Sequence, residues 1–173
     1  FLDDPHDGGY AGFGEPALDD DLSGIPASSL FQCHSSENGV TSETTNVDFG
    51  AALGLRPAEI VGSKALGSCN ALFPKLQHIP AANTDLVMIF ADDHGSPALE
   101  SPHGVCMSPP GEADAYDFHF CWKTFDAMRS CAIEGKDCQF ALGNTAEHRS
   151  NGFWSDGTPI KFLKIQDNAP VLP

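Results

Sequence analysis

Two aspartates and a histidine, Asp92-Asp93-His94, come one residue after the short apolar run Leu86–Phe90. Loops at the ends of strands are favoured positions for catalytic groups, because the sheet holds them rigidly. A carboxylate here could orient His94 as a general base, and both side-chain types can also bind a metal ion. The commoner origin of such a triplet is a polar turn that closes a buried strand. We therefore treat Asp92, Asp93 and His94 as candidate catalytic residues.

A further candidate for acid–base chemistry is His119, which alternates with aromatic residues in the segment Tyr116–Phe125. If the polar face that also carries Asp117 and Lys123 lines a cleft, His119 is the best-placed general base of the chain. The alternative is a solvated outer face on a half-buried strand. Combined with His94 and its neighbouring aspartates, His119 makes an extracellular hydrolase the enzymatic hypothesis.

Histidines and carboxylates in this region suit a transition-metal ion by residue type, since zinc accepts both. Such a site would need His94, His103 and His119 to converge, but their spacing matches no standard zinc pattern and His-Glu-x-x-His is absent. The sequence therefore leaves a metal undetermined. We expect no other cofactor, because the chain contains neither a P-loop nor a good dinucleotide fingerprint.

An aromatic pair, Phe153-Trp154, sits between the turn-forming dipeptides Asn151-Gly152 and Asp156-Gly157. Aromatic side chains held between turns can form a platform that stacks on sugar rings or on a protein surface. More often such a pair fills the core from a loop. We predict Phe153 and Trp154 as ligand-binding residues, with core packing as the alternative.

Six cysteines, an even number without a Cys-x-x-Cys pair, indicate disulfides and an oxidising, extracellular compartment. The spacing suggests that Cys131 and Cys138 bridge a hairpin. The full predicted framework is Cys33–Cys69, Cys106–Cys121 and Cys131–Cys138. Six cysteines allow about fifteen connectivities, so this framework is one of many.

The formal net charge of −15, with only nine Lys and Arg in 173 residues, limits the possible partners. Nucleic-acid binding needs clustered cations, and a polybasic membrane patch needs the same, so we expect neither partner. No run of about 18 apolar residues exists, which argues against membrane insertion. An extracellular protein or a carbohydrate remains as the partner, and the sequence leaves the oligomeric state undetermined.

Hydrophobic patterning predicts mostly short strands. Strands are expected at Leu86–Phe90, at Tyr116–Phe125, at Ile160–Ile165 and in the Cys131–Cys138 hairpin, and one short helix is expected at Pro57–Leu66. Four prolines mark residues 95–111 as a loop. The predicted fold is therefore β-rich, mainly an antiparallel sandwich or barrel with α+β as the variant, with one short helix, long loops and disulfides.

Residues 1–30 are rich in Asp, Gly and Pro and predict an irregular N-terminal arm, followed by a single disulfide-stabilised globular domain over residues 31–173. In size, cysteine content and acidity the chain is similar to small secreted proteins of fungi, including host-interaction effectors, although no motif carries this likeness. The leading hypothesis is a secreted binding protein that engages an extracellular protein or carbohydrate. The alternative is the hydrolase with a His/Asp general-base or metal site.

Overall fold

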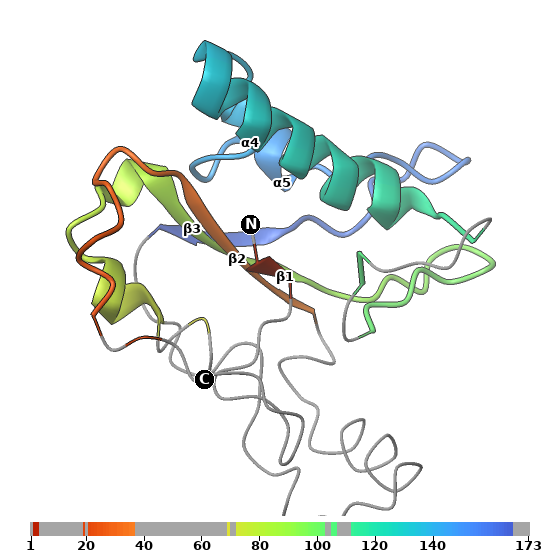
Figure 1. The fold of residues 1–173 in the computed structure, drawn as a ribbon. Coiled ribbons are helices and arrows are strands. Elements are labelled where there is room, and N and C mark those ends of the chain that lie inside the picture. The colour runs from red at the N-terminus through yellow and green to blue at the C-terminus, as the bar shows by residue number, and fades with distance from the viewer. Residues whose placement is uncertain are drawn as a thin grey trace, which may run out of the picture.

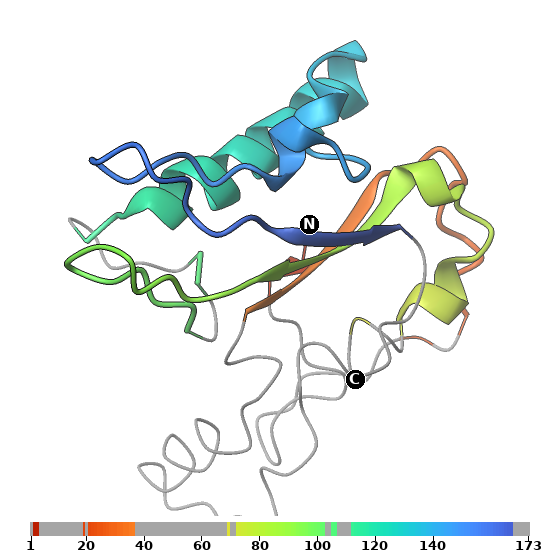
Figure 2. The same cartoon turned by 180° about the vertical axis from the view of Figure 1, so that it is seen from behind.

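The computed structural model describes residues 2–3, 19, 21–36, 69, 72–102, 105–106 and 112–167. In this part of the chain, a small sheet has helices packed over one of its faces (Figures 1 and 2). The helix predicted at Pro57–Leu66 and the histidine His103 lie outside the described residues. The division into an arm over 1–30 and a domain over 31–173 stays a prediction.

Within the described residues, the sheet contains four strands in the order β1-β2-β3-β4. Their bounds are Leu2–Asp3 for β1, Phe31–Ser36 for β2, Thr84–Ile89 for β3 and Lys164–Asp167 for β4. β2 runs parallel to β1 and β3, whereas β4 is antiparallel to β3. Every residue of β3 is buried, because neighbouring strands flank it and both its faces are covered. The strand predicted at 86–90 is therefore confirmed, and the last strand begins at Lys164 rather than at Ile160.

The helical layer begins with η4 (Asp117–Trp122), a π-helix that continues directly into the α-helix α4 (Lys123–Glu134). The short helix α5 (Ala146–Arg149) follows later in the chain, and both views place α4 and α5 over the same face of the sheet (Figures 1 and 2). Among the described residues, 3₁₀ turns also occur as η2 (Phe73–Leu76), η3 (Ala81–Asn83) and η5 (Cys138–Phe140).

The prediction of a β-rich sandwich or barrel is wrong. Helices account for more of the described residues than strands do, and the strands form one small mixed sheet. A sandwich would require a second sheet over the apolar face of the first. Here that face is covered by helix instead, since Tyr116 and Phe120 pack against Val87 and Ile89 of β3.

The segment Tyr116–Phe125, predicted as a strand, forms η4 and the start of α4. In a strand, the four aromatic residues that alternate from Tyr116 to Trp122 would share one face. In the helix, Tyr116 and Phe120 are fully buried, whereas Phe118 and Trp122 are 54% and 51% exposed. The same alternation therefore fits a helix that has one buried and one exposed set of aromatic side chains.

A capping box fixes the start of this helix. The backbone N–H of Tyr116 donates to Asp114 Oδ1 across 2.7 Å, and the backbone N–H of Asp114 donates to Asp117 Oδ2 across 2.9 Å. At the other end, Gly135 adopts the left-handed conformation with φ of 67° and donates its N–H to the carbonyl of Cys131. Both ends of the helix are thus set by local sequence.

All three predicted disulfides are present, namely Cys33–Cys69, Cys106–Cys121 and Cys131–Cys138. The elements that they join differ from the prediction. Cys131–Cys138 connects the last turn of α4 to η5 and closes no hairpin, and Cys106–Cys121 ties the loop before η4 to η4 rather than to a strand. Two of the three bonds therefore brace the continuous helix formed by η4 and α4.

Candidate functional site

Asp92 is a buried hydrogen-bond acceptor that joins three segments of the chain. Its Oδ1 accepts the backbone N–H of His94 at 3.0 Å, and its Oδ2 accepts the indole N–H of Trp154 at 3.2 Å and the backbone N–H of Lys161 at 2.8 Å. Burial by itself would raise the pKa of Asp92, but these bonds together outweigh it and hold the pKa below its ordinary value. The Asp92 carboxylate therefore links the loop after β3 to the segment that contains Trp154 and Lys161, and it does not orient the His94 ring.

The carboxylate that contacts the His94 ring belongs to Asp156, a residue that the sequence analysis named only as part of a turn. His94 Nε2 lies 2.8 Å from Asp156 Oδ2 at the surface of the protein. This hydrogen bond is the main cause that raises the pKa of His94 and lowers the pKa of Asp156 to about 2. A carboxylate that holds the ring in this way makes the imidazole more basic and reduces the fraction of it that is neutral.

His119 lies in a different pocket from the two aspartates. Its ring packs against Gly152, where an added Cβ would come within 2.8 Å of His119 Nε2. The pocket beside His119, about 370 Å³, is lined by residues that include Lys123, whereas Asp92 and Asp93 line another of about 250 Å³. Across the described residues, no set of three or more His, Cys, Asp or Glu side chains is arranged to hold a metal ion.

The aromatic pair Phe153-Trp154 does not form a shared platform. The Trp154 indole is partly buried against the core and lies over Gly95, where an added Cβ would come within 2.1 Å of the ring. Phe153, in contrast, is 67% exposed. Trp154 therefore packs partly against the core from its loop, in the manner of the alternative, and its part in ligand binding stays a prediction. The role of Phe153 in ligand binding stays a prediction.

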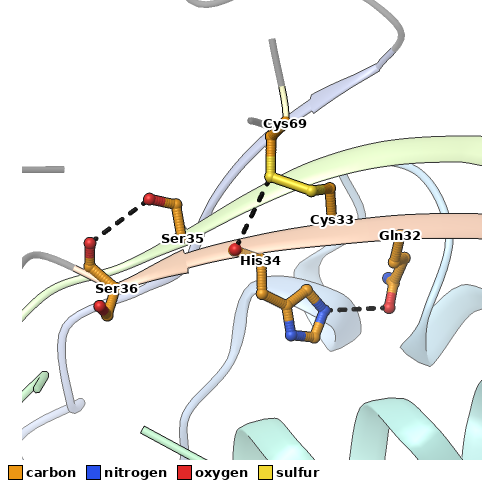
Figure 3. The surroundings of a disulfide bond; sticks show 6 residues. All are labelled: Gln32, Cys33, His34, Ser35, Ser36 and Cys69. Atoms are coloured by element: carbon orange, nitrogen blue, oxygen red, sulfur yellow. Dashed lines mark hydrogen bonds between the residues drawn. A yellow bond between two sulfur atoms is a disulfide. The ribbon is translucent and has the colours of Figure 1, made fainter. Parts of the chain in front are cut away.

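A buried hydrogen-bonded chain runs beneath the helices from Gln32 and His34 of β2 to His148 of α5. His34 Nε2 lies 3.2 Å from Gln32 Oε1, and Gln32 Nε2 lies 3.1 Å from His148 Nε2. Figure 3 shows His34 on the opposite side of β2 from Cys33, so the disulfide and this chain occupy different faces of the sheet.

Two backbone carbonyls determine which atoms donate and which accept in this hydrogen-bonded chain of side chains. Gln32 Nε2 donates to the carbonyl of Ala141, and His148 Nδ1 donates to the carbonyl of Gly143 at 2.9 Å. His148 Nε2 must then accept from Gln32, so His148 is neutral, in agreement with burial lowering its pKa to about 4. Burial likewise lowers the pKa of His34 well below its ordinary value. Because these side chains are fully enclosed, they stabilise the fold and are closed to a substrate.

The exposed side of the η4–α4 helix carries a groove that sequence reasoning missed. We call it the helix groove, and its volume is about 640 Å³. Its apolar wall contains Phe118, Trp122 and Phe125, which are each more than half exposed, and Phe140 of η5. The rings of Phe118 and Trp122 lie 4.6 Å apart, with 75° between their planes. The residues that line the groove are Phe118, Trp122, Lys123, Phe125, Asp126, Ala127, Asp137 and Phe140.

The positive and negative side chains that line the helix groove differ in how accessible their charges are to a partner. Lys123 directs its Nζ to the carbonyls of Glu147, His148 and Ser150, at 3.1, 3.1 and 2.6 Å, and burial lowers its pKa to about 8. Its positive charge is therefore already engaged at the end of α5. Asp126 remains largely exposed beside Arg129, and Asp137 accepts a hydrogen bond from a serine hydroxyl. The accessible charge of the groove is thus carboxylate.

Comparison with family models, with curated proteins and with solved structures finds no match to this chain. Within the described ranges, none of the helices is both long enough and apolar enough to cross a bilayer. The three disulfides are compatible with a secreted, disulfide-stabilised protein. The sequence signal that would have located the groove is the spacing of Phe118, Trp122 and Phe125, which places three aromatic side chains on one side of a helix.

Proposed function

We propose that this protein is a secreted binding protein and that its helix groove engages an extracellular protein partner. The observation that carries the proposal is the exposure of Phe118, Trp122 and Phe125 on one continuous helix. Burying such side chains is favourable, at about 25 cal/mol for each Å² of apolar surface removed from water. Contiguous exposed aromatic surface of this kind is characteristic of interaction sites.

The bracing of the groove supports the same proposal. Cys121 ties η4 to Cys106, and Cys131 ties the end of α4 to Cys138, which lies two residues before the groove residue Phe140. A surface held rigid before binding loses less conformational entropy when the partner docks. The π-helical turns of η4 add support, since π-helical segments in proteins frequently occur at functional sites.

Two other functions have weaker support. A carbohydrate could stack on the same aromatic rings, and a host-interaction effector would be one biological form of the protein-binding role. The hydrolase alternative depends on His94, whose ring partner is Asp156 and whose predicted partner Asp92 is occupied by Trp154 and Lys161. We therefore place protein binding first.

A displayed library of random peptides, selected against the intact disulfide-bonded protein, tests the proposal. We expect selected peptides to lose at least tenfold in affinity for Trp122→Ser or Phe125→Ser, because aromatic anchors at the centre of an interface typically cost about 2 kcal/mol or more when they are truncated. Phe162→Ser is the matched control, because Phe162 is 56% exposed but does not line the groove.

Two outcomes would reject the proposal. Selected peptides that bind the Trp122 and Phe162 variants equally well would place the interaction surface elsewhere. Binding of glycans on an array, lost with Trp122→Ser while no peptide is selected, would assign the groove to carbohydrate. Circular dichroism of each variant would establish that the helix remains folded.

A further inference from the structure

We infer that the helix groove recognises a cationic side chain of its partner, an arginine or a lysine presented among apolar residues. This inference rests on the proposed function and specifies the chemistry of the partner. It follows from the juxtaposition of Phe118, Trp122, Asp126 and Asp137 around one groove.

The aromatic walls of the groove suit a cation. The ring planes of Phe118 and Trp122 meet at 75° with centroids 4.6 Å apart, so the two rings form a corner rather than a flat stack. Aromatic faces carry negative electrostatic potential, and a cation within about 6 Å of a ring centroid is attracted to it, most strongly by tryptophan. A guanidinium or ammonium group placed in this corner would contact aromatic surface of both rings.

The carboxylates of the groove complete the cationic site. Asp126 is 76% exposed and forms an ion pair with Arg129 at 3.2 Å. An incoming guanidinium would therefore compete with an ion pair that solvent screens and not with a buried one. Asp137 Oδ2 accepts only a neutral hydroxyl, that of Ser130, at 3.0 Å among the contacts found in the described residues. Lys123 does not oppose the cation strongly, because three carbonyls already surround its ammonium.

The charge of the whole chain favours the same partner. At −15, the protein attracts cationic surfaces over long range and repels a second copy of itself. Oppositely charged partners associate faster, and this advantage falls as salt increases. A basic partner with apolar anchors therefore satisfies both the aromatic wall and the carboxylates of the groove, whereas an acidic partner would satisfy only the former.

The test uses the intact protein and two synthetic peptides with blocked ends, one alternating leucine with arginine and one alternating leucine with citrulline. Citrulline keeps the shape of arginine but carries no charge. The two tryptophans act as internal reporters in NMR, because Trp122 lies in the groove and the Trp154 indole N–H is bound to Asp92. We expect the arginine peptide to shift the Trp122 indole signal and leave the Trp154 signal in place.

A charge-matched pair of variants separates specific recognition from general attraction to an acidic protein. The double variant Asp126→Asn, Asp137→Asn should bind the arginine peptide roughly threefold to tenfold more weakly. The control Asp19→Asn, Glu100→Gln removes the same charge from exposed residues that do not line the groove and should bind within about twofold of the native protein.

Each other result overturns the inference. Equal binding of the two peptides, equal weakening by the two double variants, or no shift of Trp122 at saturating peptide would each reject cation recognition. Concentration-dependent dimerisation through Trp122 would assign the groove to a second copy of the chain. If peptides selected from the random library still require Trp122 in any of the first three cases, the proposed binding function stands and only the cationic partner is rejected.

Discussion

Trp154 donates its indole N–H to the carboxylate of Asp92 across 3.2 Å and thereby joins two loops that lie 62 residues apart in the sequence. The same oxygen accepts the backbone N–H of Lys161, and the other oxygen accepts that of His94. Two groups that suggested catalysis and ligand binding in the sequence are therefore partners in one structural contact. This contact holds the loop after β3 against the segment that leads into β4.

Replacing Asp92 with alanine should lower the free energy of unfolding by about 2–4 kcal/mol, because three donors lose their acceptor in a largely buried position. Asp93→Ala, at the exposed neighbouring position, should change it by no more than about 0.5 kcal/mol. Urea denaturation followed by tryptophan fluorescence measures both values. Equal destabilisation by the two variants would show that Asp92 does not hold these loops together.

The His94–Asp156 contact should be visible in the titration of His94. Its pKa is raised above the ordinary value, so the contact stabilises the fold below about pH 6.5 and this contribution is lost as pH rises through the raised pKa. The variant Asp156→Asn should bring the pKa of His94 down toward its ordinary value. NMR of the histidine ring protons would follow the change, and an unaltered titration would mean that the contact does not persist in solution.

Asp85 should make the protein less stable as pH rises through neutrality. It is 1% exposed, and burial, with the Asp167 carboxyl adding to it, raises its pKa to about 7. A carboxyl with a raised pKa contributes stability below its unfolded pKa of about 4, and this stability is lost as pH rises to about 7. His148, with a pKa lowered to about 4, acts in the opposite direction as pH falls.

The variant Asp85→Asn isolates the first effect, because an amide cannot ionise and its oxygen can still accept the N–H of Gly143. We expect the free energy of unfolding of the variant to increase relative to that of the native protein as pH rises, by on the order of 4 kcal/mol above about pH 8. Thermal unfolding across pH, with the exposed Asp19→Asn as control, measures the difference. A difference that does not change with pH would contradict the raised pKa of Asp85.

The three disulfides should contribute unequally to stability. Cys33–Cys69 spans 36 residues and Cys131–Cys138 spans 7, so the former removes more freedom from the unfolded chain. Loop-closure entropy predicts losses of about 4 and about 2.5 kcal/mol when the respective cysteine pairs are replaced by serine. Denaturant unfolding of the two double variants compares them, and the reverse order would indicate that the loop-entropy model does not apply here.

Selective loss of Cys131–Cys138 has a further use as a functional test. The bond ties the end of α4 to η5, which carries the groove residue Phe140. We expect replacement of this bond to weaken the binding of selected peptides while the stability of the sheet changes little. The groove loses a covalent brace, whereas β3 keeps both neighbouring strands. Hydrogen exchange of β3 amides provides the reference.

Features that depend on nearby residues could be predicted from the sequence. The apolar strand after residue 84 was identified because it is buried on both faces. The even number of cysteines indicates disulfides, and the short separation of Cys131 and Cys138 favours a local bond, but the sequence leaves the full pairing as one of about fifteen until the structure brings the sulfur atoms together. The capping box at Asp114 and Asp117 was present as well, but the aromatic alternation that follows it was interpreted as a strand.

The sequence by itself determined the acidity, the even number of cysteines and the central strand of this protein, because each depends on composition or on local patterning. Only the tertiary structure decided that the aromatic segment after Asp114 is a helix, since alternating aromatic residues fit either a strand or a helix until the sheet buries Tyr116 and Phe120. Burial of those two rings leaves Phe118 and Trp122 on the outside. Long-range packing therefore placed Trp154 against the core and created the groove on the helix.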